Sequence, residues 1–92
     1  MHCVYILGSL KDGKLYTGSC RDIKARLAEH NAGHVPATKS RRPFVLLYCE
    51  LHASRKDAMQ RETYLKTGWG RNYIERAIPE TLKNFRSKFR RV

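Results

Sequence analysis

The stretch CVYILGSLKDGKLYTGS, residues 3–19, decides the fold of this chain. Residues 3–7 form a short run rich in β-branched and aromatic side chains, which predicts a buried strand, and residues 15–19 have the composition of a returning strand. An Asp-Gly dipeptide lies between the two segments, and that pair favours the tight turn of a hairpin. The chain is therefore expected to open with a β-hairpin that holds Tyr5 and Tyr16 on neighbouring strands.

Downstream of the hairpin, the sequence predicts one further strand and three helices. The strand is FVLLYCE, residues 44–50, whose nearly continuous apolar run favours a central strand buried on both faces. The order β-β-α-β-α-α predicts an α+β fold, in which helices flank a three-stranded, mostly antiparallel sheet. The helices are expected over residues 23–31 after an Asp22 cap, from a variant capping box at residues 54–57 through residue 66, and over residues 72–78, with Gly33 and Gly68 as the stops of the first two.

The length of 92 residues corresponds to one domain. We assign residues 1–82 to that domain. Residues 83–92 are strongly basic and place Phe85 and Phe89 four positions apart, which fits either a last short amphipathic helix or a frayed arm. A basic loop with prolines near both ends, residues 34–43, joins the first predicted helix to the apolar strand.

The charge of the chain is strongly unbalanced, because 19 Lys and Arg residues oppose 8 Asp and Glu residues and give a net charge of +11. A field of that sign attracts polyanions, and nucleic acid is the expected partner. An anionic membrane is the rarer partner, and a charged surface kept for solubility is the alternative. The candidate phosphate contacts are Lys39, Arg41 and Arg42 in the loop together with Arg71, and further basic residues near the C-terminus are Arg86, Lys88, Arg90 and Arg91.

No segment of the sequence has the pattern of a secretion signal, and no apolar run approaches the ~20 residues of a membrane span. We therefore expect a cytoplasmic monomer without membrane contact. The three cysteines, Cys3, Cys20 and Cys49, form no CxxC pair, and their odd number fits thiols packed as small core residues in a reducing compartment. The alternative is a metal site that combines cysteine with histidine, for which the candidates are His2, His30, His34 and His52.

Two pairs of polar residues are placed where they could take part in chemistry. Tyr5 and Tyr16 would stand side by side on the hairpin, although cross-strand tyrosines more often serve packing. Arg26 and His30 are four residues apart and share one helix face beside the apolar residues, which could turn them into a cleft at the edge of the core. The alternative is that both are solvated residues of an amphipathic helix.

Glu62 is the most unusual residue of the sequence. It lies in the apolar stripe of its predicted helix, between Ala58 and Leu65. Burying a lone carboxylate costs on the order of several kcal/mol, so Glu62 requires a cation beside it. A buried ion pair, such as one with Arg26, and a divalent metal ion are the two explanations.

Taken together, these residues resemble the GIY-YIG nuclease family. Residues 3–5 occupy the place of its Gly-Ile-Tyr motif, and residues 16–18 occupy the place of its Tyr-Ile-Gly motif. Arg26 stands on the following helix where the family keeps its arginine, and His30 follows one turn later, where many members have histidine or tyrosine. Glu62 falls on the later helix that carries the family's metal-binding glutamate.

The resemblance covers about residues 2–78 and is closest to small stand-alone bacterial members, which carry segments similar to residues 38–43 and 65–71. Cys3 and Thr17 depart from the family motifs at packing positions. The remaining departures are Ser19 and Cys20, where larger members often carry a lysine, and the family's late asparagine, for which this chain offers Asn72 or Asn84.

The resemblance implies a metal-dependent endonuclease that hydrolyses phosphodiester bonds in DNA rather than RNA, with weak specificity or structure selectivity and a role in repair or recombination. Glu62 would hold one divalent ion, Mg²⁺ or Mn²⁺, and Arg26 would bind the scissile phosphate. Tyr5 or Tyr16 would orient and deprotonate the attacking water, with assistance from His30. All five residues are expected to converge on one cleft. The alternative function is a module that binds DNA or RNA without cleaving it.

Overall fold

The computed structural model describes residues 1–89 and opens with the predicted hairpin. Strand β1 (His2–Ser9) pairs antiparallel with β2 (Leu15–Cys20), and Tyr5 lies opposite Gly18 in this register. The turn requires Gly13, whose φ of 73° lies in the left-handed region that favours glycine.

The sheet has three strands, all antiparallel. Strand β3 (Phe44–His52) pairs with β1, so the strand order is β2-β1-β3, and the predicted α+β class is confirmed. The expectation that the apolar strand is central is wrong, because β1 is the central strand. β3 is an edge strand on which Leu46 and Leu51 are 40% and 62% exposed. An apolar run shows that a strand is hydrophobic but not how many strands flank it.

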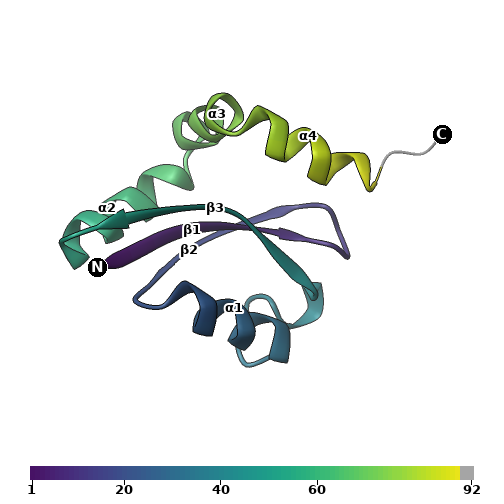
Figure 1. The fold of residues 1–92 in the computed structure, drawn as a ribbon, viewed down its shortest axis with the longest axis horizontal. Coiled ribbons are helices and arrows are strands. Elements are labelled where there is room, and N and C mark those ends of the chain that lie inside the picture. The colour runs from purple at the N-terminus through teal and green to yellow at the C-terminus, as the bar shows by residue number, and fades with distance from the viewer. Residues whose placement is uncertain (90–92) are drawn as a thin grey trace.

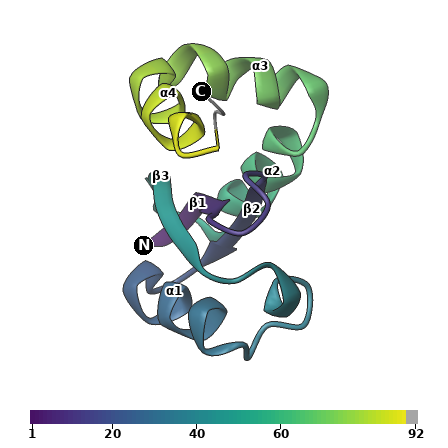
Figure 2. The same ribbon diagram turned by 90° about the vertical axis from the view of Figure 1, so that its right-hand side faces the viewer.

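Helices cover both faces of the sheet (Figures 1 and 2). One face carries α1, and the opposite face carries α2, α3 and α4. None of the helices formed by residues 1–89 has the length and hydrophobicity needed to cross a membrane. Their bounds are Ile23–Ala32 for α1, Arg55–Leu65 for α2, Gly68–Ala77 for α3 and Pro79–Ser87 for α4.

Strand β1 contributes to two separate cores because successive side chains of a strand point to opposite faces. Val4 and Ile6 pack against the α2 side, where residues of α2, α3 and α4 join them. On the α1 side, Tyr5 and Leu7 pack with Phe44 and with the apolar residues of α1. The polar residues that matter for function are positioned by these two layers.

The start of α3 differs from the prediction. The helix begins at Gly68 rather than at residue 72, because the Thr67 side chain accepts a hydrogen bond from the Gly70 N–H at 3.2 Å and caps the helix. Gly68, expected as a stop, is therefore a first helical residue. A Cβ on Gly70 would lie 2.2 Å from the carbonyl oxygen of Tyr64, so a glycine is needed where α3 starts against the end of α2.

The C-terminal helix α4 packs onto the sheet through Leu82 and Phe85, which are both buried. The predicted end of the domain at residue 82 falls inside this helix, and residues 83–87 belong to it. Residues 90–92, which include the basic residues Arg90 and Arg91, lie outside the described part of the chain.

Two of the three cysteines are paired. Cys3 on β1 and Cys49 on β3 are joined by a disulfide, and Cys20 is the free cysteine among residues 1–89. The expectation of packed thiols is wrong for the first two. Cys49 lies opposite Tyr5 in the sheet, so Cys3 is its diagonal neighbour on the same face. The pairing depends on how β1 and β3 align in the sheet. The sequence positions of Cys3 and Cys49 do not reveal that alignment.

Candidate active site

A buried chain of hydrogen bonds links β1, α1 and the loop that follows α1. The Tyr5 hydroxyl lies 2.8 Å from His30 Nε2, and His30 Nδ1 lies 2.7 Å from Thr38 Oγ1. All three residues are at most 1% exposed, so His30 is not a solvated residue of α1. The Thr38 hydroxyl lies 3.4 Å from the carbonyl oxygen of Val35. The consistent arrangement is that Tyr5 donates to Nε2 and that Nδ1–H donates to Thr38.

Two residues that build this region, Thr38 and Asn31, carry no signal in the sequence that singles them out. Thr38 stands just before a single 3₁₀ turn, Lys39–Arg41, and no pattern within a loop reveals that its hydroxyl meets a histidine. Asn31 holds the end of α1 to the start of β3, because its amide nitrogen donates to the Phe44 carbonyl at 3.1 Å and its amide oxygen accepts from the Phe44 N–H at 2.7 Å. Asn31 therefore ties α1 to β3, and Thr38 provides the partner of the buried His30 ring.

Burial and the nearby guanidinium of Arg26 decide which residues of the Tyr5–His30–Thr38 hydrogen-bond chain are protonated. Burial raises the pKa of Tyr5 to about 12, although Arg26 acts in the opposite direction. Burial lowers the pKa of His30, and the positive charge of Arg26 lowers it further. At neutral pH, Tyr5 is therefore a phenol and His30 a neutral imidazole, so a proton that leaves Tyr5 has an acceptor in contact.

The ionisation of Tyr5 gives a direct check on this environment. Its pKa in the folded protein, about 12, exceeds the usual value of 10, so the neutral phenol is favoured by folding. The contribution of the neutral Tyr5 phenol to the free energy of unfolding is fully present below pH 10 and should be lost as the pH rises from 10 to 12. A titration of tyrosine absorbance should show a late transition that Tyr5→Phe removes, beside the late transition of Tyr48, whose pKa burial also raises. Ionisation of Tyr5 near pH 10 would contradict its burial.

Tyr16 and Arg26 complete a group of four residues on the α1 face of the sheet. The Tyr16 and His30 rings meet edge to face, with centroids 5.3 Å apart. Arg26 Nη1 lies 3.5 Å from Glu29 Oε1, while its buried Nε has no hydrogen-bond partner among residues 1–89. A buried guanidinium nitrogen without an acceptor is available to an anion. We call Tyr5, Tyr16, Arg26 and His30 the α1-face cluster.

Gly18, the last residue of the Tyr-Thr-Gly segment, makes room for the cluster. A Cβ at this position would lie 2.5 Å from the Tyr5 hydroxyl oxygen and 2.6 Å from Cζ of the same ring. The phenol of Tyr5 therefore lies directly over the backbone of β2. Only a residue without a side chain allows the hydroxyl to reach both this strand and His30.

Gly18→Ala should destabilise the protein and disturb the cluster. The added methyl group cannot fit unless Tyr5 moves, and Tyr5 is fully packed, so we expect a loss of about 1–3 kcal/mol in the free energy of unfolding. Gly68→Ala is the matched control, because a Cβ at Gly68 meets no atom within 4 Å. Denaturant unfolding of both variants measures the difference, and equal stability of the two would show that Tyr5 does not lie against Gly18.

Glu62 lies on the α2 face of the sheet. Its Oε1 accepts a hydrogen bond from Ser19 Oγ at 2.6 Å, and its Oε2 accepts one from Lys66 Nζ at 2.7 Å. Burial raises the pKa of Glu62, but the hydrogen bonds from Lys66 and Ser19 outweigh burial and hold the pKa below its usual value. The alternative of an ion pair with Arg26 is wrong, because Arg26 pairs with Glu29.

The α1-face cluster and Glu62 are separated by the width of one edge strand, β2. The Tyr5 hydroxyl covers Gly18 on the α1 face, whereas Glu62 binds the next residue, Ser19, on the α2 face. The five predicted residues therefore do not share one face: four of them lie together on the α1 face, and Glu62 lies apart from them on the α2 face. A substrate that touches both groups has to pass around the open edge of β2.

That edge carries a cavity of about 470 Å³, which we call the edge cavity. Arg21 and Arg55 give it positive charge, and Glu62 forms part of its wall. Burial raises the pKa of the Cys20 thiol and the adjacent Arg26 counteracts that rise, so the Cys20 side of the cavity borders the α1-face cluster. The lining residues are His2, Ser19, Cys20, Arg21, Arg55, Ala58, Met59 and Glu62.

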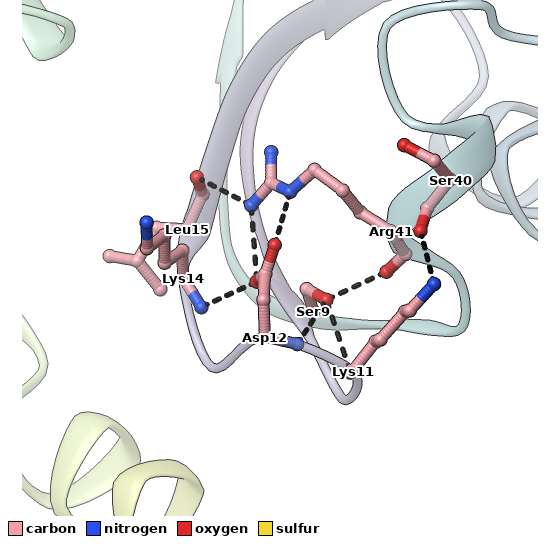
Figure 3. Close-up of polar contacts among 7 residues, drawn as sticks. All are labelled: Ser9, Lys11, Asp12, Lys14, Leu15, Ser40 and Arg41. Carbon is pink, nitrogen blue, oxygen red and sulfur yellow. Dashed lines mark hydrogen bonds and ion pairs between the residues drawn. The ribbon is translucent and has the colours of Figure 1, made fainter.

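The four predicted phosphate contacts fall into two groups. Arg41 is engaged within the fold, because its Nε donates to Asp12 at 2.7 Å (Figure 3). Its guanidinium carbon also lies 5.5 Å from the Phe44 ring centroid. Arg41 lowers the pKa of Asp12 to about 2. Arg42 Nε donates to the Lys39 carbonyl. The side chains of Lys39 and Arg71 are exposed and have no hydrogen-bond or ion-pair partner among residues 1–89.

A second polar network joins β3 to α2 and was not predicted. Arg61 Nε donates to Glu50 Oε1 at 2.7 Å, and its guanidinium carbon lies 4.5 Å from the Tyr73 ring centroid. Tyr48 and His52 also bond to Glu50. The three β3 residues are two apart in sequence and share one sheet face, which was the available signal. Because β3 is the edge strand opposite β2, this network supports the fold and does not border the α1-face cluster.

Comparison with known proteins agrees with the geometry. The family model described as the GIY-YIG catalytic domain matches residues 1–73. The chain is 49% identical over 67 residues to a UPF0213 protein of Staphylococcus haemolyticus, with 72% of this chain and 80% of that protein covered, and 43% identical with the same coverage to one of Staphylococcus aureus (strain N315). The solution NMR structure of a UPF0213 protein from Bacillus halodurans matches with a TM-score of 0.55 at 28% identity, covering 92% of this chain and 94% of that one.

The matched region includes both tyrosine segments, Arg26, His30 and Glu62, and it extends into α3. The predicted resemblance to small stand-alone proteins is thereby confirmed. The chain belongs to the GIY-YIG family, whose catalytic domains are generally those of endonucleases.

Proposed function

We propose that this chain is a metal-dependent endonuclease that hydrolyses phosphodiester bonds in DNA, acting as a cytoplasmic monomer with weak specificity or structure selectivity in repair or recombination. The observation that carries the proposal is the buried Tyr5–His30–Thr38 hydrogen-bond chain beside the Arg26 Nε, which has no hydrogen-bond partner among residues 1–89. This arrangement joins a proton acceptor to a cation that can bind a phosphate. Hydrolysis of a phosphodiester draws on both functions.

Tyr5 is the proposed base. One O–H bond of the attacking water breaks and its proton joins the Tyr5 oxygen, while the Tyr5 proton moves along the existing 2.8 Å hydrogen bond to His30 Nε2. Because the pKa of Tyr5 is about 12, a phenolate would be scarce at neutral pH, and this relay avoids forming one. Thr38 accepts from Nδ1–H and so keeps Nε2 unprotonated until it receives that proton.

Arg26 is the proposed phosphate contact. Its guanidinium can donate through Nε and Nη to two oxygens of one phosphate, and Nε has no competing acceptor among residues 1–89. Negative charge increases on those oxygens as the water attacks. Arg26 would therefore stabilise the transition state more than the bound substrate.

Glu62 is the proposed metal ligand, and its surroundings fit a hydrated Mg²⁺ or Mn²⁺. The carboxylate is ionised, and Lys66 is 53% exposed in its side chain and can swing away. No cluster of three or more His, Cys, Asp or Glu suited to a metal occurs within residues 1–89, which disfavours a zinc or calcium cage and fits an ion that keeps most of its water. The ion would stabilise charge on the leaving oxygen.

The decisive experiment is a cleavage assay on supercoiled, branched and single-stranded DNA and on RNA. Each substrate is incubated with Mg²⁺, with Mn²⁺ and with EDTA. We expect DNA cleavage that requires the metal and that is lost in Tyr5→Phe. Equal cleavage in EDTA, or cleavage by Tyr5→Phe at the wild-type rate, would contradict the proposal.

A non-catalytic nucleic-acid-binding module is the second candidate. One observation favours it: both carboxylate oxygens of Glu62 already hold protein donors, Ser19 and Lys66. This candidate predicts binding to the same substrates with no cleavage in any metal.

Binding should be governed by phosphate contacts. Affinity should fall as salt rises, and a plot of log affinity against log salt should be less steep by about one in each of Lys39→Ala and Arg71→Ala. Each variant loses one phosphate contact. Arg41 is unsuitable for this test, since its loss would unpair Asp12. Arg76→Ala is the control, because Arg76 is exposed on a different face of α3. Unchanged slopes in the first two variants would remove them from the interface.

A further inference from the structure

A second cavity, of about 330 Å³, opens on the α2 face beside β2, and the proposed chemistry does not use it. We call it the α3 cavity. Its floor is formed by the buried apolar side chains of Ile6, Leu65 and Ile74. Leu15, Tyr16 and Thr17 of β2 form its wall. The volume is at the lower end of small-molecule sites, roughly 300–1,000 Å³, which suits one planar group and excludes a duplex.

The rim of the α3 cavity is positively charged. Arg86 and Glu75 form a bidentate pair, at 2.9 and 2.7 Å, and neutralise each other. Arg71 is exposed at the rim and has no ion-pair partner among residues 1–89. An apolar floor beneath an unpaired guanidinium complements a molecule that is planar and apolar at one end and anionic at the other. A nucleotide, with its base and its phosphate, has that chemistry.

The α3 cavity also adjoins both parts of the candidate active site. Lys66 lines it and binds Glu62 Oε2 at 2.7 Å. Tyr16 lines it from β2, and the Tyr16 side chain packs against the His30 ring on the opposite, α1 face of that strand. We propose that the α3 cavity receives one unpaired base of a nucleic acid strand, with the phosphate of that nucleotide on Arg71, next to the phosphodiester that is cleaved. This inference rests on the proposed function and adds the substrate class: strands with an unpaired or extruded base, in preference to intact duplex.

The test is a binding cycle in EDTA, which does not depend on cleavage. One single-stranded oligonucleotide is abasic throughout, and its partner carries a single adenine at the centre. Fluorescence of Trp69, the one tryptophan of the chain and 78% exposed two residues from Arg71, reports binding to the wild-type protein. Thr17→Phe fills the cavity from its wall, and Thr63→Phe makes the same change on the exposed surface of α2.

We expect the adenine to strengthen binding about fivefold or more in the wild type and in Thr63→Phe, and less than twofold in Thr17→Phe. Thermal melts verify that both variants fold. Should Thr17→Phe fail to fold, a strand carrying a polycyclic base too large for the cavity replaces it, and this base should bind no better than the abasic site. An adenine effect that is absent in the wild type, or that survives filling of the cavity, overturns the inference. Binding without an adenine effect leaves the proposed nuclease standing, whereas failure to bind any strand overturns both.

Discussion

Arg26→Ala should lower the rate of cleavage about a hundredfold or more while leaving the fold and most of the affinity intact. A donor aimed at charge that develops in the transition state contributes about 3–4 kcal/mol, which is the basis of the expected rate loss. The chain carries a net charge of +11, so the loss of one cation hardly changes the field that attracts the substrate. The measurement is single-turnover cleavage beside equilibrium binding.

The stability of Arg26→Ala separates a catalytic from a structural role. Arg26 pairs with Glu29 at 3.5 Å, and these side chains are 35% and 50% exposed, so the pair contributes only about 0–1 kcal/mol. We expect the melting temperature to fall by less than about 8 °C. Removing one partner of a buried ion pair would cost about 3–5 kcal/mol, or more than about 12 °C. Lys24→Ala, at an exposed cation on the same helix, is the control. A large fall with activity recovered on cooling would mean that Arg26 is structural.

Local signals predicted the hairpin, both ends of α1 and the Ser54 cap of α2 well. Asp22 accepts a hydrogen bond from the Ala25 N–H at 3.1 Å, and Gly33 ends α1 with φ of 83°, as their sequence positions indicated. Local signals failed for β3 and α3. The place of β3 at the edge depends on which strands pair with β1, and the start of α3 depends on Gly70 packing against α2. Both are tertiary contacts that no local pattern contains.

The sequence indicated which site residues could take part in chemistry, but it did not show what surrounds each of them in the fold. Helical spacing placed Arg26 and His30 on one face. It did not reveal that His30 is completely buried, with Nδ1 against Thr38 of the following loop and its ring beside Phe44. The apolar stripe singled out Glu62 correctly as a carboxylate that needs a cation. The cation in the fold is Lys66, four residues along the same helix, a pairing that the spacing permitted.

Glu62→Gln should abolish metal-dependent cleavage, with a loss of about a hundredfold or more, and should leave the protein folded. The amide keeps an oxygen for the Ser19 hydroxyl, and the lost pair with Lys66 is partly exposed, so the cost in stability is about 0–1 kcal/mol. Calorimetric titration with Mn²⁺ gives a readout that does not depend on activity.

Lys66→Met supplies the contrast that identifies the role of this carboxylate. A metal ion held by Glu62 would compete with Lys66 for Oε2, so removing the ammonium group should strengthen Mn²⁺ binding, whereas Glu62→Gln should abolish it. The double variant should behave as Glu62→Gln does, because without the carboxylate no competition remains. If Glu62 serves only to hold Lys66 and Ser19 in place, Lys66→Met and Glu62→Gln will instead shift stability in the same direction and leave Mn²⁺ binding unchanged. Full cleavage by a folded Glu62→Gln variant would remove the metal from this position.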